Sequence, residues 1–239
     1  MFFSSPPRNL KPELLDLDDA PFDEVQDSLE DVRLVNRYLG GYRVLLYYIR
    51  NFIKRHPLDK EFLVLDLATG SADQPIVVVD MARQLNVKIK VVALDINSKM
   101  LNYAHEKIRA YPEIHLVQGD IHSPPFGENS FDVVMNSLSL HHFTRIQAVN
   151  ILRMADFMSR SGFIINDLNR SRIAYAFILI LTRVVTKNRL TRHDAPVSVM
   201  NAFTPSEMAE MAQEAGVKCF TVNRHFPYRI GLVSTRKDY

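Results

Sequence analysis

Residues 62–75 constrain the fold more than any other part of this 239-residue sequence. The first four, Phe62–Leu65, are all apolar, as in a strand buried on both faces of a parallel sheet. Asp66 follows this run, and after a few small residues a helical pattern begins near Asp73. A strand, a turn of small residues and a helix N-terminus let a ligand approach the backbone closely. An acidic residue at the strand end suits a ligand with a cationic amine or hydroxyls rather than a phosphate.

Strands and helices alternate along most of the chain. The apolar pattern predicts strands at 62–67, 88–95, 114–118, 131–136, 162–167, 218–223 and 228–234, the last two as an antiparallel hairpin. It predicts helices at 23–38, 42–55, 73–84, 98–110, 145–159 and 171–186, and one that begins with the capping sequence at 204–207. Residues 187–201 are expected to form a polar loop. This alternation is typical of an α/β fold with a doubly wound, seven-stranded, mostly parallel sheet.

Charge is distributed unevenly along the chain. The net charge is +2, yet residues 1–31 hold nine acidic and two basic residues, a net of −7. This acidic arm can fold back over the basic body or stay solvated, and the sequence leaves both options open. We expect residues 1–58 to form an N-terminal arm and helices that cover the site. Residues 59–239 are expected to form the core, with a helical lid or acceptor-binding insertion at about 169–203 before the last two strands.

The composition is that of a globular protein, with 47% hydrophobic and 23% charged residues. The single cysteine, Cys219, excludes an intrachain disulfide and fits a reducing compartment. The first residues include no apolar run of signal-peptide length, so the default expectation is a cytoplasmic protein. No basic stripe with interleaved aromatic residues is visible, and we expect no nucleic-acid partner.

Polar residues stand at the ends of four successive predicted strands: Asp66, Asp95, Asp120 and the pair Asn136-Ser137. In an open α/β sheet the ligand crevice lies beyond the carboxyl ends of the strands. Asp95 lies 25 residues after Gly70, close to the spacing at which a carboxylate meets a ribose diol. Three carboxylates at successive strand ends therefore predict a ligand site along this edge.

These residues resemble the class I S-adenosylmethionine-dependent methyltransferases from about residue 62 to 168. The family's Asp-x-Gly-x-Gly-x-Gly motif stands here as Asp66-Leu67-Ala68-Thr69-Gly70-Ser71-Ala72, with alanine at two glycine positions. The alanines fit the turn if positions 68 and 72 need no positive φ. The stretch Asp95-Ile96-Asn97-Ser98-Lys99-Met100-Leu101 and residues 36–43 are similar to the ubiquinone/menaquinone C-methyltransferase branch. The Arg-Asn pair that this branch carries after the fourth strand is replaced by Leu140-His141-His142-Phe143.

The resemblance implies S-adenosylmethionine as the cofactor. The residues it implies for binding are Asp66, Ala68, Thr69, Gly70, Ser71, Asp95, Ile96, Met100, Asp120, Ile121, Asn136 and Ser137. In this assignment Ser71 and the neighbouring backbone hold the methionine portion, and Asp66 orients its ammonium group. Asp95 takes the ribose hydroxyls while Ile96 and Met100 pack against the adenine. The adenine amino group is bound by Asp120, the Ile121 backbone supports the ring, and Ser137 faces the sulfonium end.

Two histidines are the candidate catalytic residues. His141 follows the fourth strand and could deprotonate a phenol or an acidic carbon, because imidazole titrates near neutral pH. His142 beside it is expected to cap the next helix. The second candidate is His193, in the polar stretch Thr191-Arg192-His193-Asp194. Residues Asn166–Arg170 offer either hydrogen bonds to an acceptor oxygen or capping of the fifth strand. No convincing ligand cluster for a metal is recognisable, so none is expected.

The run Ile173–Val185 is unusually apolar but too short to span a bilayer. It is either a core helix under the lid or the wall of a site for a lipophilic acceptor. We therefore expect a methyltransferase that acts on an oxygen or carbon of a small lipophilic acceptor, such as a phenol, a quinone precursor or a polyketide. The alternatives are a protein or RNA methyltransferase and a non-catalytic interaction module. Peripheral contact with a membrane and a homodimer are further options that the sequence leaves open.

Overall fold

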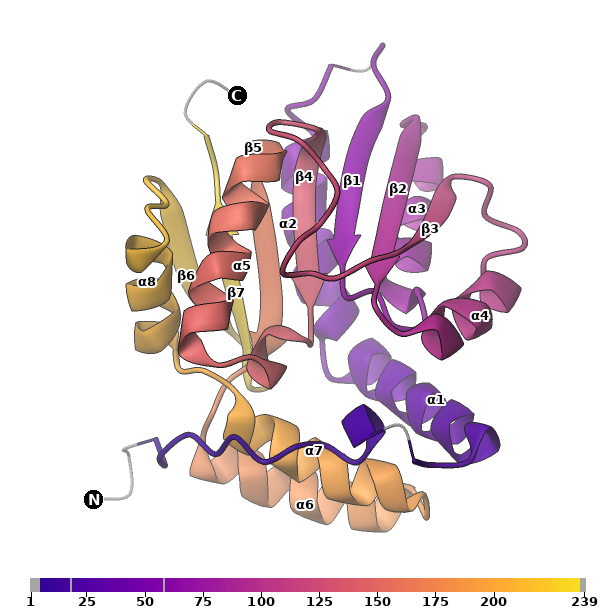
Figure 1. Ribbon diagram of the computed structural model, residues 1–239, viewed down its shortest axis with the longest axis vertical. Helices are drawn as coiled ribbons and strands as arrows, with labels where there is room; N and C mark the ends of the chain where they lie inside the picture. The colour runs from indigo at the N-terminus through magenta and orange to yellow at the C-terminus, as the bar shows by residue number, and fades with distance from the viewer. Residues whose placement is uncertain (1–4, 18, 58, 237–239) are drawn as a thin grey trace.

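The computed structural model describes residues 5–17, 19–57 and 59–236. Its centre is a sheet in the order β3-β2-β1-β4-β5-β7-β6 (Figure 1). The strands are β1 (Phe62–Leu67), β2 (Ile89–Asp95), β3 (Ile114–Gln118), β4 (Phe131–Ser137), β5 (Ser159–Leu168), β6 (Phe220–His225) and β7 (Arg229–Ser234). The first five are parallel, whereas β7 is antiparallel to both β5 and β6. The predicted doubly wound, seven-stranded, mostly parallel sheet and its terminal hairpin are confirmed.

Helices cover both faces of the sheet and also the side at which the parallel strands end, which we call the carboxyl edge. They are α1 (Phe22–Tyr38), α2 (Gly41–Ile53), α3 (Asp73–Gln84), α4 (Ser98–Lys107), α5 (Arg145–Met158), α6 (Arg172–Val185), α7 (Arg189–Asn201) and α8 (Pro205–Glu214), with short 3₁₀ turns η1 (Leu15–Leu17) and η2 (Leu140–His142). Buried residues of α2, α3 and α4 share one apolar core with the sheet, and those of α5 and α8 share the other. The remaining helices, α1, α6 and α7, lie beyond the carboxyl ends of the parallel strands (Figure 1).

The expected polar loop at 187–201 is wrong, because residues Arg189–Asn201 form α7. The helix continues through Pro196, although proline removes a backbone hydrogen bond there. Many of its buried side chains are polar and hydrogen-bond to α1 or to the N-terminal residues: Thr191, Asp194 and Ser198. Because these partners come from far along the chain, α7 lacks the apolar periodicity by which a buried helix is recognised.

The N-terminal arm, residues 5–17, folds back over the body. The backbone N–H groups of Leu14 and Leu15 donate to the two carboxylate oxygens of Asp194 at 2.7 and 3.0 Å. The Arg8 guanidinium donates to the carbonyls of His141 and Phe143 at 2.9 and 2.7 Å. Of the two options left open by the sequence, the arm takes the one in which it packs against the body.

The turn after β1 keeps the left-handed backbone that glycines would favour. Ala68 and Ala72 have φ of 56° and 57°, and Gly70 between them has φ of 55°. The condition that positions 68 and 72 need no positive φ is therefore not met. Each alanine destabilises the fold by about 1 kcal/mol, because its Cβ crowds the backbone in this conformation.

This backbone geometry makes Ala68→Gly a stabilising substitution. Ala68 is only partly buried, so little packing is lost with its methyl group. We expect the free energy of unfolding to rise by about 0.5–1 kcal/mol in urea denaturation. As a matched control, Ala176→Gly on the exposed face of α6 should lower it by about 1 kcal/mol. Equal destabilisation by both substitutions would contradict the left-handed geometry.

Candidate active site

The turn between β1 and α3 presents backbone to open space. A Cβ added at Gly70 would meet no heavy atom within 4 Å. The side chains of Thr69 and Ser71 on either side are buried. No side chain caps the N-terminus of α3 at Ala72, which leaves its first N–H groups without that partner. The predicted residues from Ala68 to Ser71 thus form an open, backbone-lined turn at the end of β1.

Asp66 is buried beside this turn with one carboxylate oxygen unpaired. Its side chain is only 1% exposed, and Oδ2 has no hydrogen-bond partner among the described residues. Burial raises the pKa of Asp66 to about 8, and the nearby carboxylates of Asp73 and Asp95 add to the effect. A buried acceptor without a donor is unfavourable by itself, so this position fits a cationic or hydroxyl-bearing ligand.

Asp66 is one of several unpaired groups around the turn and the ends of β4 and β5. Five of the buried side-chain oxygens without a partner in the described part of the chain lie here, namely Asp66 Oδ2, Thr69 Oγ1, Gln74 Oε1, Asn136 Oδ1 and Asn166 Oδ1, and two more are Ser161 Oγ and Asn201 Oδ1. The amide nitrogen of Asn136 donates to the Leu67 carbonyl at 2.8 Å, which places it beside the end of β1. Acceptors gathered at one edge suit the ammonium and hydroxyl donors of S-adenosylmethionine, and the residues present therefore fit this cofactor.

Asp95 joins the ends of β1 and β2. One of its carboxylate oxygens accepts from the Gly70 N–H at 2.7 Å and the other from the Asn97 N–H at 2.9 Å. Next to it Ile96 is 65% exposed, an unusual place for a large apolar side chain. Met100 lies in the first turn of α4, which Asn97 caps. A carboxylate beside free apolar surface matches the predicted ribose and adenine contacts.

The remaining predicted cofactor residues stand at the next strand ends. Asp120 is exposed and accepts from the His122 N–H at 2.8 Å, while Ile121 is buried. Ser137 ends β4 and accepts from the Asn166 amide at 3.4 Å. The structure thus places these residues on the same edge of the sheet as Asp66 and Asp95.

Other residues near the carboxyl edge were not singled out from the sequence. Tyr42 donates to Asp73 at 2.7 Å, which brings the start of α2 over the start of α3. Arg229 is fully buried at the start of β7, where Nη2 donates to Asn36 at 3.0 Å and Nη1 has no partner among the described residues. Burial lowers the pKa of Arg229 to about 10, although the charge of Asp167 opposes this shift. Only the resemblance over residues 36–43 hinted at Asn36 and Tyr42, and nothing in the sequence indicated Arg229.

The imidazole of His141 is buried between two carboxylates. Its Nδ1 donates to Asp167 at 2.7 Å, and its Nε2 lies 3.5 Å from a carboxylate oxygen of Glu13 in the arm. Burial alone would lower the pKa of His141, but the charges and hydrogen bonds of Asp167 and Glu13 outweigh it and raise the pKa to about 10. At neutral pH the ring is therefore a cation with both nitrogens engaged, which does not favour a role as base.

His142 does not cap the next helix as expected, because Thr144 caps α5 in a capping box. Instead its Nδ1 pairs with Asp16 of the arm at 2.9 Å, and its ring stacks on His141. One ligand atom each of Glu13, His141 and His142 lie within 4.8 Å of one another. Since Glu13 and His141 already compensate each other's charge, we assign no metal to this cluster, and a metal-free mechanism stays a prediction.

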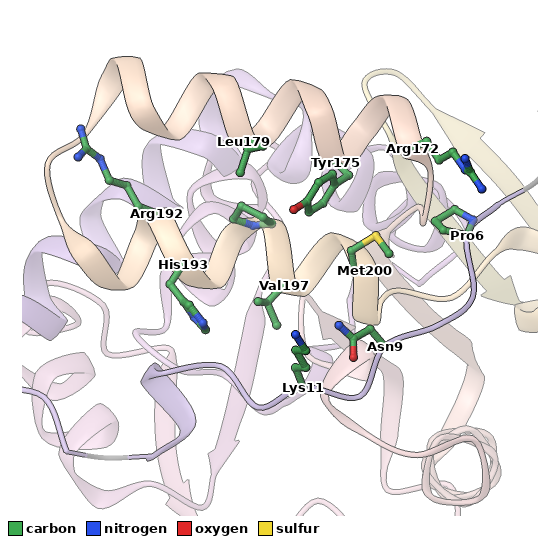
Figure 2. A pocket seen from close by; sticks show the side chains of 11 residues that line it. Pro6, Asn9, Lys11, Arg172, Tyr175, Leu179, Arg192, His193, Val197 and Met200 are labelled. Carbon is green, nitrogen blue, oxygen red and sulfur yellow. The ribbon is translucent and has the colours of Figure 1, made fainter. Parts of the chain in front are cut away.

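His193 lies apart from the strand ends, on the outer side of α7. It lines a groove of about 590 Å³ between α6, α7 and the arm (Figure 2). Its Nδ1 pairs with Asp194 at 2.7 Å. None of the predicted cofactor residues lines this groove, so the structure does not bring His193 together with them.

Residues 64–162 match the family described as a methyltransferase domain. A demethylmenaquinone methyltransferase from Thermotoga maritima is 30% identical over 169 residues, which cover 64% of this chain and 69% of that protein. One from Lactobacillus johnsonii is 34% identical over 96 residues, 39% of this chain and 38% of that protein. The ubiquinone/menaquinone biosynthesis C-methyltransferase of Wigglesworthia glossinidia brevipalpis is 36% identical over 84 residues, 34% of this chain and 32% of that protein. The chain thus spans between 32% and 69% of the lengths of these relatives.

Solved structures show the same fold. The magnesium protoporphyrin IX methyltransferase of Synechocystis PCC 6803, solved with bound SAH, has a TM-score of 0.61 at 15% identity and covers 90% of this chain and 94% of that one. A SAM-dependent methyltransferase from Aquifex aeolicus has a TM-score of 0.57 at 17% identity, covering 78% of this chain and 88% of that one. With these relatives, the predicted enzyme class and cofactor are confirmed at the level of the family. The chain belongs to the class I S-adenosylmethionine-dependent methyltransferases, near their ubiquinone/menaquinone C-methyltransferase branch.

Proposed function

We propose that this protein transfers a methyl group from S-adenosylmethionine to an oxygen or carbon of a small lipophilic acceptor. The observation that carries the proposal is the unpaired, buried Asp66 oxygen beside the left-handed turn, with Asp95 at the neighbouring strand end. Buried polar groups are normally hydrogen-bonded, so several unpaired acceptors gathered around one turn favour a ligand-binding site over a purely structural region. This also argues against a non-catalytic module.

The residues divide the work of binding the cofactor. Asp66 orients the ammonium group, the turn supports the methionine portion, and Asp95 takes the ribose hydroxyls. We assign the methionine carboxylate to Arg229, whose buried Nη1 has no other partner among the described residues. When bound, S-adenosylmethionine supplies a methyl group already activated on a sulfonium, so the protein mainly aligns the reactants.

Two observations support a lipophilic acceptor: the names of the relatives and the apolar side chains of the inserted helices. The names of the relatives point to quinone precursors, and α6 and α7 supply apolar side chains beyond the strand ends. We propose that residues 169–203 form the acceptor-binding lid and that the arm and helices of residues 1–58 cover the site. Helix α1, which lies beyond the strand ends and holds five acidic and two basic residues, disfavours a nucleic-acid backbone there, so the RNA alternative has less support.

We give His141 a positioning role in place of the predicted base role. As an imidazolium it links the arm, through Glu13, to the end of β5, through Asp167. The acceptor must still lose a proton, and the base role of His193 stays a prediction. The cytoplasmic location expected from the sequence stays a prediction as well.

Two measurements test this function. Calorimetric titration of the full chain with S-adenosylmethionine should give saturable binding. Labelled methyl transfer should then appear on lipophilic phenols or reduced quinones in a solvent-extractable product. A folded protein without cofactor binding would favour the non-catalytic module. Label that enters only protein or RNA would favour the macromolecular alternative.

If His193 is a base, His193→Ala should reduce kcat about 100-fold and leave the cofactor dissociation constant unchanged, because general-base catalysis contributes on this order. His105→Ala, at an exposed position on α4, is the matched control. Loss of cofactor affinity, or equal turnover by both variants, would exclude this role for His193.

A further inference from the structure

Helix α6 exposes a row of large apolar side chains. Ile173, Phe177, Ile180 and Val184 recur at steps of four, three and four residues and share one face of the helix. Ile180 is 65% and Val184 78% exposed. The opposite face packs on α7 and its neighbours through Ala174 and Ile178. A helix at the surface of a globular protein normally presents polar residues on its solvent-facing side. This exposed apolar row therefore indicates a surface that binds another molecule or a membrane.

The segment that contains α6 has several basic residues. Residues 168–193 contain no acidic residue. Four exposed cations in this stretch have no acidic partner among the described residues: Arg172, Arg183, Lys187 and Arg192. Lys11 of the arm also reaches the groove beside α6, where Arg172 and Arg192 stand at opposite ends (Figure 2). Cations thus flank the apolar row at both ends of α6, whereas Asp31 and Glu24 of α1 contact Thr186 and Arg189 just past its C-terminal end.

From these observations we propose that α6 docks on an anionic phospholipid bilayer, with its apolar row among the acyl chains and the cations at the headgroups. Figure 1 shows α6 beyond α7, on the side of the molecule toward which the parallel strands point. No helix in the described part of the chain is long and apolar enough to cross a membrane. An interfacial helix with basic flanks matches a peripheral attachment.

Charge argues against a second copy of the chain as the occupant. A two-fold contact through α6 would place the same unpaired cations opposite one another. No acidic residue between 168 and 193 is available to neutralise them. Anionic headgroups provide the opposite charge along the whole helix.

Vesicle co-sedimentation of the full chain tests this proposal, which goes beyond the proposed function and does not depend on it. Binding to an equal mixture of phosphatidylcholine and phosphatidylglycerol should exceed binding to phosphatidylcholine alone and weaken with added salt. The double variant Ile180→Ser/Val184→Ser should bind at least about tenfold more weakly. Arg172→Gln should bind about fivefold more weakly. The matched controls Ile146→Ser on α5, where Ile146 is 76% exposed, and Lys54→Gln after α2 should bind like the wild type.

Three results would overturn the proposal: no binding of folded wild type to anionic vesicles, equal losses in the α6 variants and the controls, or a wild-type dimer that the double variant converts to a monomer. The last would identify α6 as a subunit interface. Calorimetric titration of the double variant with S-adenosylmethionine separates the two proposals, since docking variants should keep wild-type cofactor affinity. Vesicle binding without any cofactor binding would count against the proposed function alone.

Discussion

Asp95→Asn should weaken S-adenosylmethionine binding at least about 100-fold, or ~3 kcal/mol, in calorimetric titration. The reason is chemical: a carboxylate offers two anionic acceptors to a ribose diol, and an amide keeps only one neutral acceptor. The substitution also leaves either the Gly70 or the Asn97 N–H without an acceptor, because Asp95 now accepts from both. We therefore expect a loss of about 1–2 kcal/mol in unfolding free energy as well.

The controls for Asp95→Asn must show that weaker cofactor binding comes from the lost contact with the ribose, and not from the removal of one negative charge or from unfolding of the protein. Glu128→Gln removes an exposed carboxylate that accepts a hydrogen bond from the adjacent Asn129 amide at 3.4 Å, and the cofactor affinity of this variant should equal that of the wild type. The Asp95→Asn protein should still unfold cooperatively at the temperature of the titration. Cofactor binding of wild-type strength by this variant would show that Asp95 does not hold the ribose.

The parts of the fold that the sequence predicted well are those with local causes. Strands β1 and β3 and helix α3 have the predicted bounds, because apolar runs and polar ends mark them directly. The Thr204–Glu207 capping box starts α8 as expected. At the site, the strand-end rule brought Asp66, Asp95 and Asn136 to one edge without any knowledge of side-chain packing.

The parts that were missed depend on contacts between distant segments. Helix α7 was taken for a loop because its buried polar groups find their partners in the arm, 185 residues away in the pair Ser198–Glu13. Arg229 and Asn36 are 193 residues apart in sequence, and no local pattern predicts their contact. The protonation of His141 likewise depends on Glu13 and Asp167 together, so its charge could not be inferred from residues 140–143 alone.

Stability should fall as pH rises from 6.5 to 10, and His141 is the cause. Its folded-state pKa of about 10 lies above the ordinary value of 6.5. A raised pKa stabilises the folded state fully below the unfolded value, and this stabilisation is lost as pH rises through the folded value. The expected slope is about 1.4 kcal/mol of unfolding free energy per pH unit. Burial of Asp66, whose pKa is about 8, gives a slope of the same sign at lower pH, and the lowered pKa of Arg229, about 10, gives a slope of opposite sign near pH 10. The range from about pH 8.5 to 9.5 therefore reports mainly on His141.

Asp167→Asn tests the charge of His141 by removing the carboxylate with which the imidazolium pairs. Burial opposes ionisation of Asp167, but the charge and hydrogen bond of His141 outweigh it and hold the pKa of Asp167 below its usual value. Removing this partner leaves the His141 imidazolium with Glu13 alone, so we expect a loss of about 3–5 kcal/mol in unfolding free energy at pH 7. The slope between about pH 8.5 and 9.5 should shrink, because the folded-state pKa of His141 falls when its nearest carboxylate is removed.

Asp132→Asn is the matched control, because Asp132 is equally buried but pairs at 3.3 Å with Arg160, whose side chain is 39% exposed. Water can solvate Arg160 when the carboxylate is lost, so this variant should lose only about 1–2 kcal/mol and keep the wild-type alkaline slope. Equal losses and equal slopes in the two variants would mean that His141 is neutral in the folded protein. Its Nε2 would then be free to accept a proton once Glu13 moves away, which would restore the base role first predicted for this residue.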